Sequence, residues 1–386
     1  MTRLAAAICL AWLTSAFAAE PAPSAPGRVL TVGPGQQYVS IADAARAARD
    51  GDTVEIAAGE YRADVAVWTQ KHVTIRAVQG RARLVADGAA AEGKAIWVMR
   101  GGEFVVENID FTGARVRERN GAGIRFESGR LMVRNCTFTD NENGILTAGD
   151  ENAALEIDRS EFGHSGAGDG YSHNLYAGTI RKLSVTRSYF HHARTGHLLK
   201  SRARENDIRY NRLTDETGGR ASYELEFPSG GVAYVVGNIV QQSGTTENPI
   251  VVSFGGEGYR WPRSELYLVH NTLVDDRGPP GTLLRIAPGA DRVVVANNLT
   301  VGGAELAGDR VGHYTANFNV RPSDLARGSA FEYRLPRNSG LLGRAVPIAP
   351  IDGVSLTPLE EYAHPLNSRP LAGLRLSPGA LQQSSP

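Results

Sequence analysis

The stretch GHLLKSRARENDIRYN (Gly196–Asn211) carries the pattern around which the chain is organised. Two other stretches follow the same plan, SHNLYAG (Ser172–Gly178) and SYELEFPSGG (Ser222–Gly231). Aligned, they give an apolar column of Leu175, Leu199 and Leu225 and a polar or charged column of Tyr176, Lys200 and Glu226. Consecutive residues of a strand point to opposite faces. We therefore expect the leucines to line an interior. The second column, hereafter the outward row, is expected to lie on the outer surface.

From about Val73 onward, an apolar-alternating strand followed by a polar residue, often Asn, recurs along the chain. The units recur every 23 to 33 residues and end at Phe111, Phe138, Phe162, Phe190, Leu213, Val240, Leu273 and Leu299. A period of this size, with strands and no long helix, predicts an all-β solenoid of stacked parallel strands. The 44 glycines suit the many turns that such a fold needs. The repeated asparagines are predicted to occupy turns rather than to bind sugar; they are Asn135, Asn211, Asn238, Asn271 and Asn297.

The two ends of the repeat have features of their own. Ser40 followed by an alanine-rich run that stops at Gly51 predicts a short N-terminal helix. A stack of strands needs such a cap, because its open end would expose apolar interior. We expect residues 28–303 to form the solenoid with its cap. Residues 304–386 are expected to form a tail that packs back along it.

The first eighteen residues, MTRLAAAICLAWLTSAFA, predict a signal peptide cleaved after Ala18. Arg3 is the positive residue, and the apolar run that follows is too short for a membrane span. Residues 19–27 are expected to be a linker, and the mature protein to be exported to the periplasm or the medium. Cys136 is then the one cysteine left, so no internal disulfide can form. A buried packing thiol is favoured there over a nucleophile.

Charge and motifs exclude several classes of function. The chain has 41 basic and 41 acidic residues, and this balance gives no general attraction to nucleic acid. The sequence contains no dinucleotide fingerprint, phosphate loop, CxxC pair or HExxH motif. We expect a monomer that acts on an acidic polysaccharide, with no nucleic-acid partner.

The outward row and its neighbours supply the candidate functional residues. The candidate catalytic residues are Tyr176, His197, Lys200, Arg202 and Glu226. The candidate substrate-binding residues are His173, Asn174, Arg204, Arg220 and Glu224. Residues two apart share a strand face, so Arg202 is placed with Lys200, Glu224 with Glu226 and Asn174 with Tyr176. Charge is concentrated in these middle coils, since the outward positions on either side are assigned to Thr147 and Ser253. The structural alternative is a solvated charge row in which Glu224 and Glu226 neutralise Lys200 and Arg202.

Residues Leu199–Asn238 resemble the core of the alginate lyase and chondroitin B lyase group, in the pectin-lyase-like superfamily of right-handed parallel β-helix proteins. The matches, in order, are Lys200-Ser201, Asn206, Arg209-Tyr210-Asn211 and Gly237-Asn238, with Gly230-Gly231 in place of the group's His-Gly pair. The resemblance implies the right-handed parallel β-helix fold. It also implies β-elimination on a uronate polysaccharide, with Lys200 as the base that removes the proton at C5.

The chemistry fits in part. Arg202, and also Arg204, could hold the uronate carboxylate, and Tyr176 could protonate the leaving oxygen. The group's catalytic arginine would fall near Glu226, whereas Arg220 lies in the turn before that strand. Glu226 beside Lys200 works against a base role. Calcium is implied by the resemblance, but Arg194-Thr195-Gly196 stand where its acidic ligands would be.

Two other functions stay open at the level of sequence. A glycoside hydrolase of the same fold needs paired acids, which Glu224 and Glu226 could supply. A non-catalytic polysaccharide-binding protein would be expected to show exposed aromatic rows, whereas the row here is charged.

Overall fold

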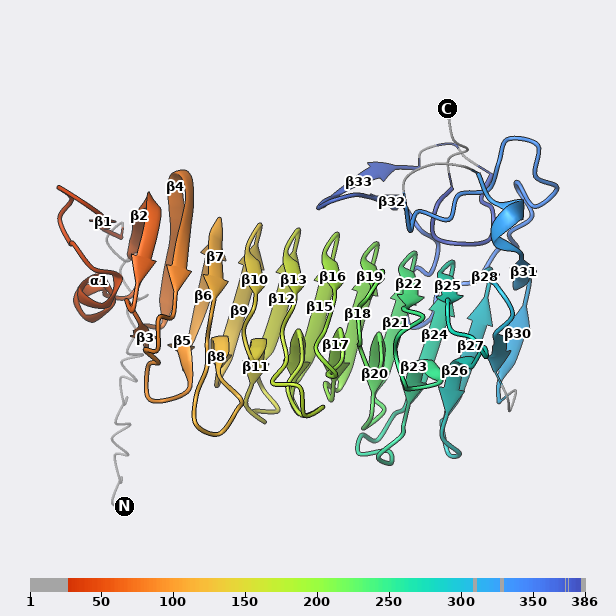
Figure 1. Ribbon diagram of the computed structural model, residues 1–386, viewed down its shortest axis with the longest axis horizontal. Coiled ribbons are helices and arrows are strands. Elements are labelled where there is room, and N and C mark those ends of the chain that lie inside the picture. The colour runs from red at the N-terminus through yellow and green to blue at the C-terminus, as the bar shows by residue number, and fades with distance from the viewer. Residues whose placement is uncertain (1–26, 308–310, 327–329, 372, 374, 383–386) are drawn as a thin grey trace, which may run out of the picture.

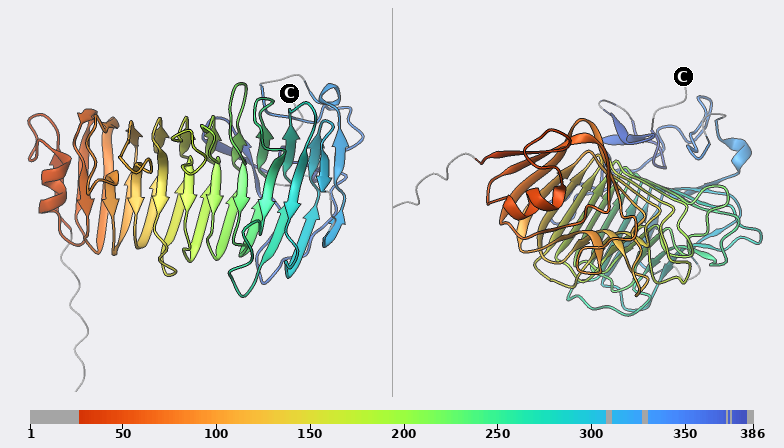
Figure 2. Two further views of the ribbon diagram at one scale, coloured as in Figure 1. Left: turned by 60° about the horizontal axis from the view of Figure 1, so that its bottom comes forward. Right: turned by 60° about the vertical axis from the view of Figure 1, so that its left-hand side comes forward.

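The computed structural model describes residues 27–307, 311–326, 330–371, 373 and 375–382 (Figure 1). The predicted signal peptide and all but the last residue of the predicted linker lie outside the described residues. The chain winds as a parallel β-helix whose coils stack along one axis (Figure 2). Among the described residues the strands form one sheet of 21 strands and one of ten, plus a separate hairpin. No helix in this part of the chain has the length and apolar character to cross a membrane.

The ten-stranded sheet receives one short strand from each coil. Its strands, in stacking order, are β3 (Ala66–Trp68), β5 (Ala95–Met99), β8 (Ala122–Phe126), β11 (Asn143–Thr147), β14 (Leu175–Ala177), β17 (Leu199–Ser201), β20 (Leu225–Phe227), β23 (Ile250–Phe254), β26 (Thr282–Ile286) and β29 (Glu305–Ala307). Every pairing within this sheet is parallel.

The 21-stranded sheet bends into two walls, because most coils supply two strands separated by a short turn. The first wall holds β1 (Val29–Val32), β2 (Thr53–Arg62), β4 (His72–Val85), β6 (Gly102–Glu107), β9 (Gly129–Arg134), β12 (Ala154–Asp158), β15 (Lys182–Thr186), β18 (Glu205–Arg209), β21 (Val232–Val236), β24 (Glu265–Val269), β27 (Arg292–Ala296) and β30 (His313–Thr315). The second wall holds β7 (Ile109–Thr112), β10 (Thr137–Thr139), β13 (Glu161–Gly163), β16 (Tyr189–His191), β19 (Arg212–Thr214), β22 (Ile239–Gln242), β25 (Thr272–Asp275), β28 (Leu299–Val301) and β31 (Phe318–Val320). The long strands β2 and β4 pair along both walls.

A ladder of buried polar side chains joins the turns between the two walls. Its buried members are Cys136, Ser160, Ser188, Asn211, Asn238, Asn271 and Asn298, and it ends at the half-buried Asn317. The backbone N–H of Asn211, for example, donates to Oδ1 of Asn238 at 3.0 Å, and that of Asn238 donates to Asn271 at 2.9 Å. Asn135 and Asn297 lie one residue earlier, in the left-handed region at φ 48° and 56°. All five asparagines are therefore turn residues, as predicted.

Cys136 occupies the first position of this ladder. It is a free, fully buried cysteine, and burial raises the pKa of its thiol to about 12. Because the thiolate is the reactive form, the structure confirms the predicted packing role.

Inward side chains stack from coil to coil inside the second wall. Phe111, Phe138, Phe162 and Phe190 lie nearly parallel, with ring centroids 4.9, 4.8 and 4.6 Å apart, which matches the usual distance between paired strands. Leu213, Val240 and Leu273 continue the column, as predicted. The prediction for Leu299 is wrong. Asn298 rather than Asn297 takes the ladder position, so Leu299 pairs with Thr272 and Thr300 pairs with Leu273.

The N-terminal end of the solenoid is covered by helix α1 (Ile41–Ala47), as Figure 1 shows. Ser40 caps it by accepting a hydrogen bond from the N–H of Asp43 at 3.1 Å. Ile41, Ala44 and Ala45 are buried in the same apolar core as the solenoid interior. The helix therefore seals the apolar interior, as the sequence predicts.

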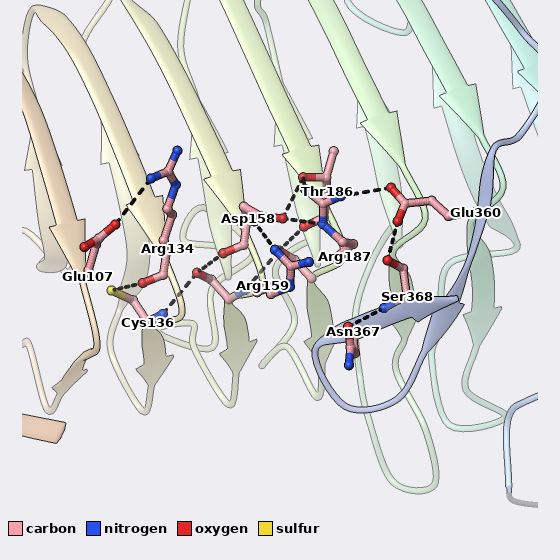
Figure 3. A network of polar contacts seen from close by, with 12 residues as sticks. Glu107, Arg134, Cys136, Asp158, Arg159, Thr186, Arg187, Glu360, Asn367 and Ser368 are labelled. Carbon is pink, nitrogen blue, oxygen red and sulfur yellow. Dashed lines mark hydrogen bonds and ion pairs between the residues drawn. The ribbon is translucent and has the colours of Figure 1, made fainter. Parts of the chain in front are cut away.

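After β31, the last strand of the solenoid, the chain turns back along the solenoid. β30 and β31 still pair with β27 and β28, so the solenoid extends past Gly303. A 3-10 helix, η1 (Pro322–Asp324), and an antiparallel hairpin of β32 (Glu360–Ala363) and β33 (Asn367–Pro370) follow. Leu356 of this tail packs on Tyr234 and Tyr267 of the first wall. Glu360 binds Arg187 at 2.9 Å, and Arg187 also binds Asp158 at 2.7 Å (Figure 3).

Candidate active site

The predicted outward row forms on the ten-stranded sheet. Tyr176 pairs with Lys200 in the strand register, and Lys200 pairs with Glu226. The leucines that precede these residues on β14, β17 and β20 are fully buried in the core. The predicted placement of the row is therefore confirmed, whereas the catalytic roles of its residues remain predictions.

Lys200 and Arg202 bind the same carboxylate, that of Glu257. The Arg202 guanidinium contacts both oxygens of Glu257, with Nη2 at 2.9 Å from Oε1, and Lys200 Nζ lies 3.3 Å from that same oxygen. Arg202 Nε also donates to the Tyr176 hydroxyl at 2.8 Å. The Arg202 contact holds the pKa of Glu257 below its ordinary value. A cationic fork and an ammonium group thus converge on one carboxylate.

Glu226 links Lys200 to a pair of histidines. Its Oε2 lies 3.2 Å from Lys200 Nζ and 2.9 Å from His197 Nε2. Burial raises the pKa of Glu226, but His197 and Lys200 outweigh it and leave the pKa below its ordinary value. The backbone N–H of His197 donates to His173 Nδ1 at 2.9 Å, and the two rings lie 4.4 Å apart.

The two histidines are buried, and the pKa of each lies below its ordinary value. Burial lowers the pKa of His173 well below its ordinary value, and the nearby His197, Lys200 and Arg202 lower it further. Burial also lowers the pKa of His197, and Glu226 offsets this only in part. His173 further contacts the Tyr176 ring at 5.3 Å. The structure thus gathers His173 and all five candidate catalytic residues in one cluster.

A cleft of about 580 Å³ lies beside this cluster. Arg119, Arg125, Leu146, Tyr171, Tyr176 and Arg202 are among the residues that line it. Arg119 is held 3.4 Å from Asp169. Arg125 has a buried Nε without a hydrogen-bond partner, and burial lowers the pKa of its guanidinium. The cleft therefore offers cationic groups on two separate strands, β8 and the end of β17.

Asn174 and Glu224 were placed wrongly by the alternation argument. Both precede their strands, at the bend of the coil, and both are fully buried. The Asn174 amide group donates to the carbonyl oxygen of His191 at 2.8 Å. Glu224 accepts a hydrogen bond from Gln242 at 3.1 Å, and burial raises its pKa well above the ordinary value. Neither side chain reaches the outer face.

Arg204 and Arg220 do not join the cluster. Arg204 is exposed and lines a separate hollow with Tyr234 and Asp352, at the start of the first wall. Arg220 is also exposed and borders a small hollow of about 100 Å³ with Asn248.

Of the two residues predicted to flank the row, Ser253 is confirmed and Thr147 is wrong. Ser253 pairs with Glu226, as predicted. Upstream, however, Leu146 and not Thr147 pairs with Tyr176, and the next residue in that column is Arg125. Charge therefore also occurs two coils upstream of Tyr176, at Arg125.

Sequence reasoning missed several residues of the site. Glu257 and Ser229 lie in loops, where no strand period indicates their direction; Ser229 Oγ is 3.4 Å from Arg202. Arg285 pairs with Ser253 and contacts Tyr223, whose ring lies 5.0 Å from His197. Extending the aligned column by further coils would have found Arg125 and Arg285.

The cluster does not fit the calcium ion that the resemblance implies. Calcium takes six to eight oxygen ligands, with carboxylates prominent. The carboxylates of Glu226 and Glu257 are already bound by Lys200 and Arg202. Arg194-Thr195-Gly196 precede the lysine strand without supplying an acid.

Comparison with known proteins bears on the fold. No protein-family model matches the chain, and no curated protein matches its sequence. A solved pectate lyase, Pel9A, is similar at 11% identity and a TM-score of 0.52, over 93% of this chain and 97% of that one.

Two further solved structures are more distant. They are ORF18 of Geobacillus virus E2 (12% identity, TM-score 0.46, 73% of this chain and 55% of that one) and the pectin methylesterase of Aspergillus niger (14%, 0.36, 82% and 91%). We draw nothing from either at these TM-scores. The pectate lyase match and the stacked parallel coils agree, and the chain is a right-handed parallel β-helix of the pectin-lyase-like fold.

Proposed function

We propose that the chain is an exported enzyme that cleaves a uronate-containing polysaccharide by β-elimination at the outward row. In this proposal Lys200 is the base, Arg202 holds the substrate carboxylate and Tyr176 protonates the leaving oxygen. The site lies on the outer face of the solenoid, beside an open cleft that suits a linear polymer.

One observation carries the proposal: Lys200 and Arg202 already bind a carboxylate. Glu257 occupies the Arg202 fork, and one of its oxygens also contacts Lys200. Its side chain is 47% exposed and comes from the loop between β23 and β24. A uronate carboxylate has the same charge and bidentate shape. We infer that substrate displaces Glu257 and takes its place on Arg202.

The proposed reaction requires three groups in sequence. Lys200 removes the proton at C5, next to the carboxylate, and Arg202 stabilises the negative charge that develops on that carboxylate. The electron pair forms a C4–C5 double bond as the C4–O bond breaks. Tyr176, whose hydroxyl is held by Arg202 at 2.8 Å, gives the leaving oxygen its proton.

The same geometry explains why Glu257 must move. In the free protein Glu257 Oε1 lies 3.3 Å from Lys200 Nζ and occupies the place beside the base that the substrate needs. Once Glu257 leaves, the uronate carboxylate can bind Arg202 and bring its C5 atom next to Lys200.

Arg125 supports an acidic polymer rather than a single sugar. Its guanidinium lines the same cleft and retains a buried Nε without a partner. An unpaired buried donor is costly unless a ligand satisfies it. We assign Arg125 to the carboxylate of another uronate along the chain.

The structure changes which acids could serve the alternative function, a glycoside hydrolase. Glu224 is excluded from it by its place in the interior. Glu226 and Glu257 remain, since both lie within 3.3 Å of Lys200 Nζ. Paired acids of this kind are what glycoside hydrolysis uses, so hydrolysis is tested alongside elimination.

The test is to incubate the purified protein with alginate, pectate and glycosaminoglycans and to follow the ultraviolet absorbance of the unsaturated product. We expect a rise with one polymer, which Lys200→Ala abolishes. Lys182→Ala is the matched control, because Lys182 also pairs with a glutamate, Glu205 at 2.6 Å, but on the first wall.

Each other outcome overturns part of the proposal. A rise that survives Lys200→Ala would keep elimination and remove Lys200 as the base. New reducing ends without the absorbance would identify a hydrolase that uses Glu226 and Glu257. Neither signal with any of the polymers would contradict an enzyme acting on these substrates.

A further inference from the structure

Three histidines meet on the second wall, away from the outward row. His191 ends strand β16, His192 follows it, and His164 follows strand β13 one coil earlier. The Nδ1 atoms of His191 and His192 lie 2.8 Å apart. The His164 ring stacks on that of His192 at 4.8 Å and meets that of His191 edge-on at 5.1 Å. One ring nitrogen from each of the three lies within 4.8 Å of the other two.

His191 is held in one orientation by its surroundings. Its Nε2 lies 3.2 Å from Glu161 Oε1, so this nitrogen faces a carboxylate and Nδ1 faces the other histidines. Its ring stacks on Tyr189 at 4.4 Å. Gly163, its partner in the strand register, leaves room for the ring, since a Cβ there would lie 2.3 Å from His191 Cε1.

This arrangement is the one that metal-binding histidines use. A ligating imidazole commonly donates its second N–H to a carboxylate, which fixes the ring and makes the ligating nitrogen more basic. Three imidazoles that leave a position for water make a familiar zinc site. Imidazole nitrogen prefers zinc, copper and nickel to calcium and magnesium.

The surrounding charges allow a cation. Arg194 lies nearby but binds Asp140 at 2.7 Å. Glu216 accepts hydrogen bonds from Tyr189 and Arg212, both at 2.6 Å.

We propose that His164, His191 and His192 bind one divalent transition-metal ion of the zinc class, with Glu161 as the residue that positions His191. The ion would join two successive coils, those of β13 and β16, on a face separate from the proposed active site. This inference does not depend on the proposed function.

The test is calorimetric titration of the chelator-treated protein with zinc chloride. We expect one zinc ion per chain and a rise in the melting temperature. His164→Ala combined with His192→Ala should raise the dissociation constant at least ~10-fold, and Glu161→Gln about 10-fold, as for other residues that position a ligand. His72→Ala, which removes an exposed histidine of the first wall, should leave binding unchanged.

Three results would overturn the proposal. They are no saturable binding to the unaltered protein, equal binding by the His164/His192 double variant, and calcium binding as tight as zinc binding. Circular dichroism checks that each variant is folded. His164 is exposed, so His164→Ala alone serves as the test if the double variant unfolds.

Discussion

The outward row and the buried ladder are both columns with one side chain per coil, yet they are built in opposite ways. From Asn211 onward the ladder repeats one residue type, and Asn211, Asn238 and Asn271 each satisfy the backbone of a neighbouring coil. The row changes chemistry at each step, from Tyr176 to Lys200 to Glu226. A repeated polar column therefore indicates stability, whereas a column whose residues differ and carry charge indicates a site.

The largest expected effect is the loss of folding stability when a ladder asparagine is replaced. Asn238 Oδ1 accepts from the backbone and the side chain of Asn211, both at 3.0 Å, and its Nδ2 donates to Ile208 and Asn271. Asn238→Ala leaves several buried groups unpaired, so we expect it to lower the free energy of unfolding by about 3–4 kcal/mol. Denaturant unfolding measures this loss.

Catalytic constants of any folded Asn238→Ala protein should be unchanged. The exposed Asn152 gives the control, and Asn152→Ala should change stability by less than about 0.5 kcal/mol. A ladder variant as stable as this control would remove the distinction between the two columns.

The next largest expected effect is the loss of activity when Arg202, beside the outward row, is replaced. Arg202→Ala removes the fork that holds a carboxylate, and we expect kcat/KM to fall by about 10²- to 10³-fold, as for other transition-state contacts. Stability should fall by only about 1 kcal/mol, since the Glu257 partner is half exposed. Arg130→Ala breaks an exposed pair with Glu156 on the first wall and should leave activity intact. An equal loss of activity in both variants would count against the site.

Most of these two columns could be predicted from the sequence, because side chains within a strand alternate between its two faces with a period of two residues. The middle of the row and the Phe stack follow from it, and the Lys200 strand lies where the alignment places it. The register differs by one residue from the expectation at Thr147 and at Leu299. The period fails at bends, so Asn174 and Glu224 turned inward although they lie two residues before outward ones. It says nothing about loops, so Glu257 could not be found. The His164 cluster needs two turns with left-handed residues, at φ 55° and 47°, which no local pattern predicts.

A fully buried acid, Asp215, contrasts with the half-exposed Glu257 of the site. Asp215 is fully buried and accepts the N–H groups of Ala193 and Ala221 at 3.2 and 2.8 Å. Burial nevertheless raises its pKa to about 7. The folded protein then binds a proton that the unfolded chain has lost, so stability is present at low pH and falls as pH rises from about 4 through about 7.

Asp215→Asn isolates this contribution. Between pH 5 and pH 8 the unaltered protein should lose about 2 kcal/mol more stability than the variant does, measured by denaturant unfolding at both pH values. Identical pH dependence of the two proteins would show that Asp215 is ionised in the folded state.

The smallest expected effect tests whether Glu257 stands in for substrate. Glu257→Gln keeps the shape of the side chain but weakens its hold on Arg202 and Lys200. An uncharged competitor should be displaced more easily, so we expect KM for the polymer to fall by about 2- to 5-fold, within the range of one exposed ion pair. Glu151→Gln, which weakens an exposed pair with Arg260 in the same loop as Glu257, is the control and should leave KM unchanged. A large drop in kcat with Glu257→Gln would instead make Glu257 a catalytic acid and favour hydrolysis, whereas a fall in KM alone would mean that the free protein already holds a carboxylate where its substrate binds.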